Sequence, residues 1–96
     1  MTRGTLHAEV VVYSTRLCGY CMRARELLAA RGIDFQEYAV DSDREKRREM
    51  ETLSGRRTVP QIFIGGLSIG GYDALHALDT TGKLDRLLFR KGTGQP

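Results

Sequence analysis

Residues 10–21 of this 96-residue chain have the sequence VVVYSTRLCGYC. The run Val10–Ser14 is largely apolar and β-branched, which is typical of a strand in the buried middle of a sheet. Both cysteines of the chain, Cys18 and Cys21, follow this run at the start of a helical pattern. Two thiols with two residues between them at a strand-to-helix junction indicate a redox site or a metal site.

The position of the thiols assigns them different roles. Unpaired N–H groups and the positive end of the helix dipole lie at a helix N-terminus, so they favour the thiolate of Cys18. Because the thiolate is the reactive form of cysteine, Cys18 is the expected nucleophile. Cys21 comes three residues later on the same helix face. We therefore expect Cys21 to be the resolving thiol, which attacks a disulfide formed by Cys18.

Length and composition restrict the classes of protein to which this chain can belong. Ninety-six residues suit one domain over residues 1–96, with an ordered core at about 9–89 and a flexible tail at 90–96. The first residues lack the apolar segment of a signal peptide, and no stretch approaches the roughly 20 apolar residues of a membrane span. We therefore expect a protein without membrane association. A lone thiol pair without an export signal favours the reducing cytoplasm.

The net charge of +3 comes largely from arginine and lysine residues within 44–57, where acidic residues alternate with them. Mixed signs on a helix indicate a solvated surface. No base-reading motif or stacking pair accompanies the charge, so nucleic acid is not an expected partner. Small anions and acidic proteins are the partners that such a surface favours.

The remaining patterns predict the element order β-α-β-α-β-β-α, with a candidate additional C-terminal helix. Expected helices cover residues 19–31, about 43–54, 72–80 and, as the candidate, 83–89, and expected strands cover residues 10–14, 33–40, 58–64 and 67–69. One parallel crossover followed by a hairpin predicts an α/β fold, in which helices cover both faces of a small mixed sheet.

Several residues carry specific expectations within these elements. Ser42 and Glu45 have the spacing of a capping box at the start of the second helix. Met50 and Leu53 are the apolar residues through which that helix is expected to pack. Pro60 must stand at the start of its strand, because proline cannot donate to the sheet.

Beside the two thiols, the sequence contains two further motifs, Thr58-Val59-Pro60 and Gly70-Gly71-Tyr72-Asp73. With Cys18-Gly19-Tyr20-Cys21, they make the chain resemble the glutaredoxin family over about residues 10–88. It is most similar to the dithiol members of the small bacterial glutaredoxin 3 type. The resemblance implies a thioredoxin fold, in which a mixed four-stranded sheet is flanked by helices on both faces.

The resemblance also implies an activity. Glutaredoxins are glutathione-dependent disulfide oxidoreductases, so the implied substrates are protein–glutathione mixed disulfides and protein disulfides, with glutathione as the reducing co-substrate. The implied partners are glutathione and disulfide-bearing or glutathionylated proteins, and the chain is expected to be a monomer. The glutathione-binding residues that it implies are Arg16, Tyr20, Arg56, Arg57, Thr58, Val59, Pro60, Gly71, Tyr72 and Asp73.

Each implied contact has a physical basis. Val59, held extended by Pro60, can offer its backbone to the cysteinyl part of glutathione as a strand would; in the family this proline is cis. The amides of Tyr72 and Asp73 open a helix and can bind the γ-glutamyl carboxylate. The basic side chains, Arg16, Arg56 and Arg57, suit the glycyl carboxylate, although solvated charge is an equal alternative for the last two.

The chain departs from the family pattern at three positions, where Thr15, Gly19 and Ala74 stand in place of lysine, proline and a frequent acid. Gly19 removes an obstacle to an alternative family function, in which Cys18 of two chains and two glutathiones hold a [2Fe–2S] cluster. Zinc would require a dimer, because no second pair of cysteines or histidines completes a site. His7 and His76 are interpreted as incidental.

Overall fold

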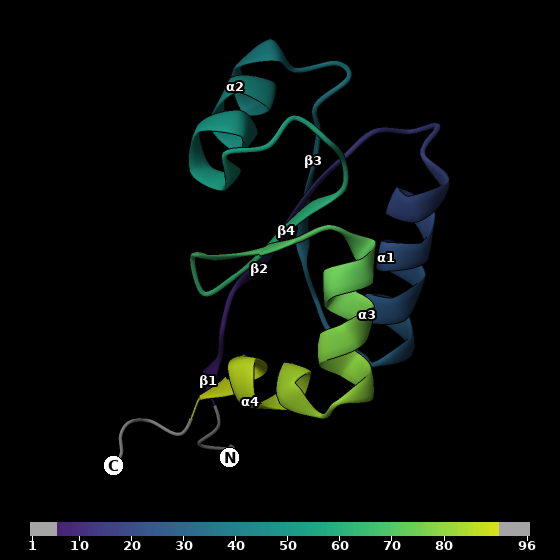
Figure 1. Ribbon diagram of the computed structural model, residues 1–96, viewed down its shortest axis with the longest axis vertical. Coiled ribbons are helices and arrows are strands. Elements are labelled where there is room, and N and C mark those ends of the chain that lie inside the picture. Colours follow the sequence, from purple (N-terminus) through teal and green to yellow (C-terminus); the bar gives the residue numbers. More distant parts are fainter. Residues whose placement is uncertain (1–5, 91–96) are drawn as a thin grey trace.

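The computed structural model describes residues 6–90 (Figure 1). The central sheet has the strand order β3-β2-β4-β5, in which β2 and β3 are parallel and the other neighbours antiparallel. Its strands are β2 (Val10–Ser14), β3 (Gln36–Ala39), β4 (Gln61–Ile64) and β5 (Leu67–Gly70). The helices are α1 (Gly19–Ala30), α2 (Arg44–Ser54), α3 (Tyr72–Thr80) and α4 (Lys83–Leu88).

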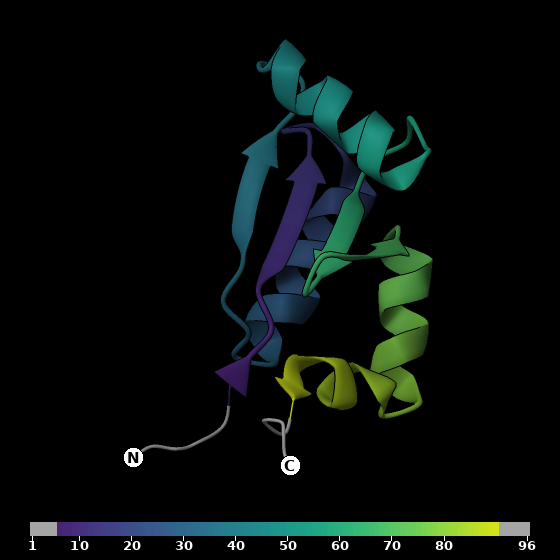
Figure 2. The ribbon, with the colours of Figure 1, turned by 90° about the vertical axis from the view of Figure 1, so that its left-hand side faces the viewer.

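Alternation along β2 divides the core into two layers. Val10 and Val12 face one side of the sheet and join the apolar residues of α1, α3 and α4, among them Leu28 and Leu75. Tyr13 faces the other side and packs with Met50 of α2. Figures 1 and 2 show the result: α1 and α3 lie together on one side of the sheet, and α2 crosses it near the end of β2. The expected α/β fold with helices on both faces is confirmed.

The ends of the chain differ from the expectation. Leu6–His7 (β1) pairs antiparallel with Phe89–Arg90 (β6), so regular structure extends beyond the expected core of residues 9–89 at both ends. Phe89 was expected in the last helix, but α4 ends at Leu88 because the chain becomes extended to pair with β1. The rest of the predicted tail, residues 91–96, lies outside the described residues.

Two local expectations for α2 are wrong. The helix begins one residue later than the capping box requires, because the Asp43 carboxylate accepts the Lys46 N–H at 3.0 Å. The Ser42 hydroxyl instead donates to the Ala39 carbonyl. Leu53 is 57% exposed, whereas Met50 is fully buried. The helix therefore contacts the sheet along a narrower line than the apolar pattern suggested.

Two expected strands are shorter than their patterns. β3 covers only Gln36–Ala39, because Ile33 and Phe35 pack from the preceding loop against the core beneath α1. The strand expected from residue 58 begins at Gln61, since Thr58, Val59 and Pro60 form a separate loop. None of the helices in the described part of the chain has the length and apolar character needed to cross a membrane.

Met50→Ala should lower the free energy of unfolding by about 2–5 kcal/mol, because it empties a fully buried site beneath α2. Leu53→Ala is the matched control on the same helix and should change it by no more than about 0.5 kcal/mol. Urea unfolding followed by circular dichroism measures both. Equal losses in the two variants would contradict the observed packing of α2.

Candidate active site

Cys18 caps the N-terminus of α1. Its backbone is extended, with φ −111° and ψ 118°, while its carbonyl accepts the first helical hydrogen bond from the Met22 N–H. Its sulfur accepts the Cys21 N–H at 3.2 Å and lies 3.8 Å from the Val59 carbonyl oxygen, to which the thiol can donate. Both cysteines are free thiols. The loop from β2 thus brings a sulfur to the positive end of a helix.

The two thiols have opposite electrostatic environments. Partial burial opposes ionisation of Cys18, but hydrogen bonds from Cys21 and from the Tyr20 N–H, with the nearby charge of Arg25, hold the pKa of Cys18 below its ordinary value. Cys21 is fully buried. Its burial, with the hydrogen bond to Cys18, raises the pKa of Cys21 to about 11. Cys18 is therefore the more readily ionised thiol of the pair, whereas Cys21 stays protonated at neutral pH.

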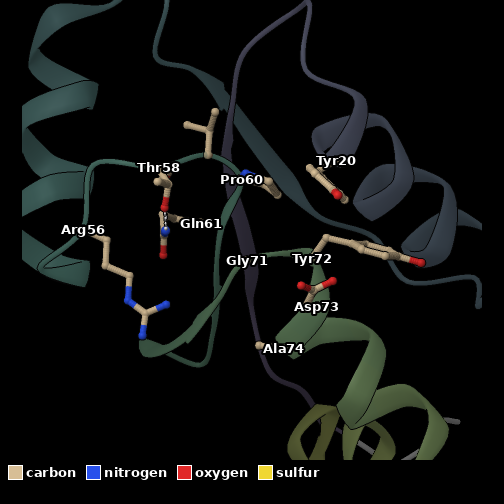
Figure 3. Close-up of a pocket in the computed structure, with 10 residues that line it drawn as sticks. Tyr20, Arg56, Thr58, Pro60, Gln61, Gly71, Tyr72, Asp73 and Ala74 are labelled. Atoms are coloured by element: carbon tan, nitrogen blue, oxygen red, sulfur yellow. Dashed lines mark hydrogen bonds between the residues drawn. The ribbon is translucent and has the colours of Figure 1, made fainter.

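A cavity of about 400 Å³ (Figure 3) is lined by Val59, whose carbonyl contacts the Cys18 sulfur. Three segments form it: the start of α1, the loop before β4 and the start of α3. Figure 3 shows Arg56 on one side and Tyr20 and Tyr72 on the other. The lining residues are Tyr20, Arg56, Thr58, Val59, Pro60, Gln61, Gly71, Tyr72, Asp73 and Ala74.

The loop before β4 carries backbone groups into this cavity. The Val59–Pro60 peptide bond is cis, as the resemblance implied. Gly70, with φ +119°, precedes α3, and a Cβ there would lie 3.5 Å from the Arg56 guanidinium. Because L side chains rarely adopt this φ, glycine is the residue that the turn accepts. The turn places the first amides of α3 opposite Pro60.

Side chains that sequence reasoning missed hold this loop. Gln61 is 1% exposed, and its amide donates to the Thr58 carbonyl and hydroxyl at 3.0 and 3.1 Å. Arg47 of α2 donates to the Arg57 carbonyl at 2.8 Å, and Ser54 accepts the Arg56 N–H. The one signal in the sequence was the polar Gln61 inside an apolar strand.

An aromatic row borders the cavity. The Tyr20 ring, 58% exposed, stacks on Tyr72 with 6.3 Å between centroids, and Tyr72 lies 5.7 Å from His76. The Arg23 guanidinium lies over the Tyr20 ring, 5.6 Å from its centroid. His76, interpreted from the sequence as incidental, thus supports a ring that lines the cavity.

The structure brings together eight of the ten residues that the resemblance implied for glutathione. The other two lie elsewhere. Arg16 forms an exposed ion pair with Asp41 and lines a different cavity. Arg57 does not line the first cavity, and its carbonyl is engaged by Arg47.

Comparison with known proteins identifies the family. Residues 10–69 match the family model for glutaredoxin. The chain belongs to the glutaredoxin family. Glutaredoxin 3 of Escherichia coli K12 is 52% identical over 81 residues, which cover 84% of this chain and 98% of the relative.

Solved structures agree with this assignment. A glutaredoxin from Brucella melitensis superposes with a TM-score of 0.76 at 47% identity, over 86% of this chain and 90% of the other. A buckwheat glutaredoxin, solved as a complex with glutathione, has a TM-score of 0.77 at 34% identity, over 84% and 76% of the two chains. Family membership confirms the expected enzyme class, a thiol–disulfide oxidoreductase.

For this member of the family, iodoacetamide at about pH 7 should label Cys18 and leave Cys21 unlabelled. The depressed Cys18 pKa gives this thiol the larger thiolate fraction at that pH, whereas Cys21 ionises only as the pH approaches about 11. Mass spectrometry of the labelled chain reads the site. In denaturant both thiols should react alike, and similar labelling of both in the folded protein would contradict the assignment.

Proposed function

We propose that this protein reduces protein–glutathione mixed disulfides and protein disulfides with glutathione as its electron donor, as a monomer in the cytoplasm. The observation that carries the proposal is the position of Cys18. Its sulfur lies at a helix N-terminus and against the Val59 carbonyl, which lines the cavity. The related buckwheat glutaredoxin, solved with glutathione, supports this choice of ligand.

The cavity offers one group for each part of glutathione. The backbone of Val59 suits the cysteinyl residue, whose sulfur would then lie beside Cys18. The amides of Tyr72 and Asp73 suit the γ-glutamyl carboxylate at the start of α3. Arg56 suits the glycyl carboxylate from the opposite side of the cavity. Arg16 and Arg57 lie outside the cavity, so we assign the glycyl carboxylate to Arg56.

The first reaction needs only Cys18. Its thiolate attacks the glutathione sulfur of a mixed disulfide, the bond between the two substrate sulfurs breaks, and the protein leaves as a thiolate that takes up a proton. Cys18 then carries glutathione. A second glutathione thiolate attacks that sulfur, which releases glutathione disulfide and restores Cys18.

Protein disulfides require Cys21 as well. After Cys18 has attacked, the second protein sulfur is still attached to the substrate chain and can reverse the reaction. Cys21, whose N–H already contacts the Cys18 sulfur, is placed to attack Cys18 and release the reduced protein. Two glutathiones then reduce the Cys18–Cys21 disulfide.

Replacement of each thiol separates the two reactions. Cys18→Ser should abolish glutathione-dependent reduction of a small glutathionyl mixed disulfide, because the nucleophile is lost. Cys21→Ser should retain much of that activity and lose most reduction of protein disulfides. Coupling to glutathione reductase measures the rates. Activity of Cys18→Ser would refute Cys18 as the nucleophile. Reduction of the wild-type Cys18–Cys21 disulfide by thioredoxin reductase alone would refute glutathione as the electron donor.

The cluster alternative rests only on Gly19, which stands where the family has proline. Among the described residues, no group of three or more cysteine, histidine or acidic side chains could hold a metal ion within one chain. It would need two chains and two glutathiones. Anaerobic reconstitution with iron, sulfide and glutathione should leave a colourless monomer by size-exclusion chromatography. A brown dimer would overturn this expectation.

A further inference from the structure

A second cavity, of about 300 Å³, lies at the carboxyl ends of β2 and β3. It shares no lining residue with the first cavity. Its lining combines polar and charged groups: Ser14, Thr15, Arg16, Arg25, Glu37 and Ala39. The resemblance assigned a role to only one of these, Arg16, and the reaction steps proposed above give no role to the others.

Within this cavity the guanidinium of Arg25 is fixed in place. It donates to the Glu37 carboxylate at 2.7 Å, and the buried Ser14 hydroxyl donates to the same carboxylate oxygen. The side chains of Arg25 and Glu37 are 27% and 34% exposed, so the pair is less screened than a surface ion pair. Ser14 belongs to β2 and Glu37 to β3, so the sheet fixes the position of the Arg25 charge.

Arg25 follows Cys21 by four residues on α1 and so lies one turn further along the same helix face. Its charge lowers the pKa of Cys18 and also opposes the raised pKa of Cys21. It is the one charged side chain in the described part of the chain that acts in this direction on both thiols.

The other charges near the thiols are less suited to this role. Arg16, before the thiols, is 83% exposed and paired with Asp41. Across the first cavity, Asp73 of α3 and Arg56 have opposite signs. The Glu37 carboxylate on β3 carries the opposite charge to Arg25. One of its oxygens already accepts hydrogen bonds from Ser14 and Arg25.

Negative charge moves between the two sulfurs during the reaction. It begins on Cys18 and departs with the first leaving thiolate. Cys21 must then lose its proton to solvent and attack the Cys18 sulfur; the bond from Cys18 to its partner sulfur breaks, and the departing thiolate takes up a proton. A cation held near both sulfurs favours both charged states.

We propose that Arg25, held by Glu37 and Ser14, is a positioning residue of this reaction, which stabilises the thiolate first on Cys18 and then on Cys21. The inference rests on the proposed roles of the two thiols. In this proposal, a residue of the second cavity influences the ionisation of both thiols, whereas glutathione binds in the first cavity.

The test measures the pH midpoint of Cys18 alkylation by iodoacetamide in a Cys21→Ser background, where one thiol reacts. Arg25→Gln should raise the midpoint by about 0.5 pH unit or more, because a nearby positive charge is lost. Arg25→Lys keeps the positive charge, so the midpoint should stay close to the value measured with Arg25 present. Arg23→Gln removes one charge from the outer face of the same helix and should leave the midpoint unchanged.

Glu37→Gln separates electrostatics from packing. The amide still accepts hydrogen bonds from Ser14 and Arg25 but lacks the opposing charge, so the midpoint should stay constant or fall. A rise equal to that of Arg25→Gln would overturn the proposal, as would equal midpoints for Arg25→Gln and Arg23→Gln. Thermal unfolding confirms that each variant is folded. The titration uses no glutathione, so its failure would leave the proposed electron donor untouched.

Discussion

The hydrogen bond from the Cys21 N–H to the Cys18 sulfur is the contact around which the site is arranged. It exists because α1 begins at the residue after Cys18, so the first amides of the helix point at the sulfur instead of at a carbonyl. The same turn that stabilises a thiolate on Cys18 places Cys21 beneath it, inside the core. One short helix start therefore produces both a reactive thiol and a protected one.

That helix start is useful only because the rest of the fold brings other segments to it. β2 delivers the loop that carries Cys18, and the adjacent β4 is preceded by the cis-proline loop, whose Val59 carbonyl lies 3.8 Å from the sulfur. α3 begins beside the same loop. Backbone groups line much of the cavity, and such groups recognise a peptide without relying on particular side chains. This arrangement suits a small peptide thiol as the proposed reductant.

The polar side chains around the site divide into two groups. Gln61, Arg47 and Ser54 hold the loop before β4 and so shape the first cavity. Arg25 and Glu37 lie on the other side of β2, in the second cavity. The first group shapes the cavity in which we propose that glutathione binds, and the second supplies the charge that we propose governs which sulfur is ionised.

Motifs within short stretches were sufficient for much of the fold and the site. The patterns of residues 10–14, 19–31 and 58–69 predicted β2, α1 and the β4–β5 hairpin, because each depends on local backbone preference or on periodicity. The helix cap at Ser42 and the burial of Leu53 were wrong. Both depend on how α2 lies against the sheet, and neighbouring residues do not encode that orientation.

By itself, the sequence determined where the thiols lie on α1, since the order strand, thiol, helix sets the polarity of α1 and the positions of Cys18 and Cys21 on it. Only the tertiary structure decided which cations reach them. Arg16, close in sequence to Cys18, pairs with Asp41, whereas Arg25 pairs with Glu37 of β3, whose carboxylate also accepts the Ser14 hydroxyl of β2. The physical reason is that an ion pair needs its partner in space, and these partners lie on neighbouring strands.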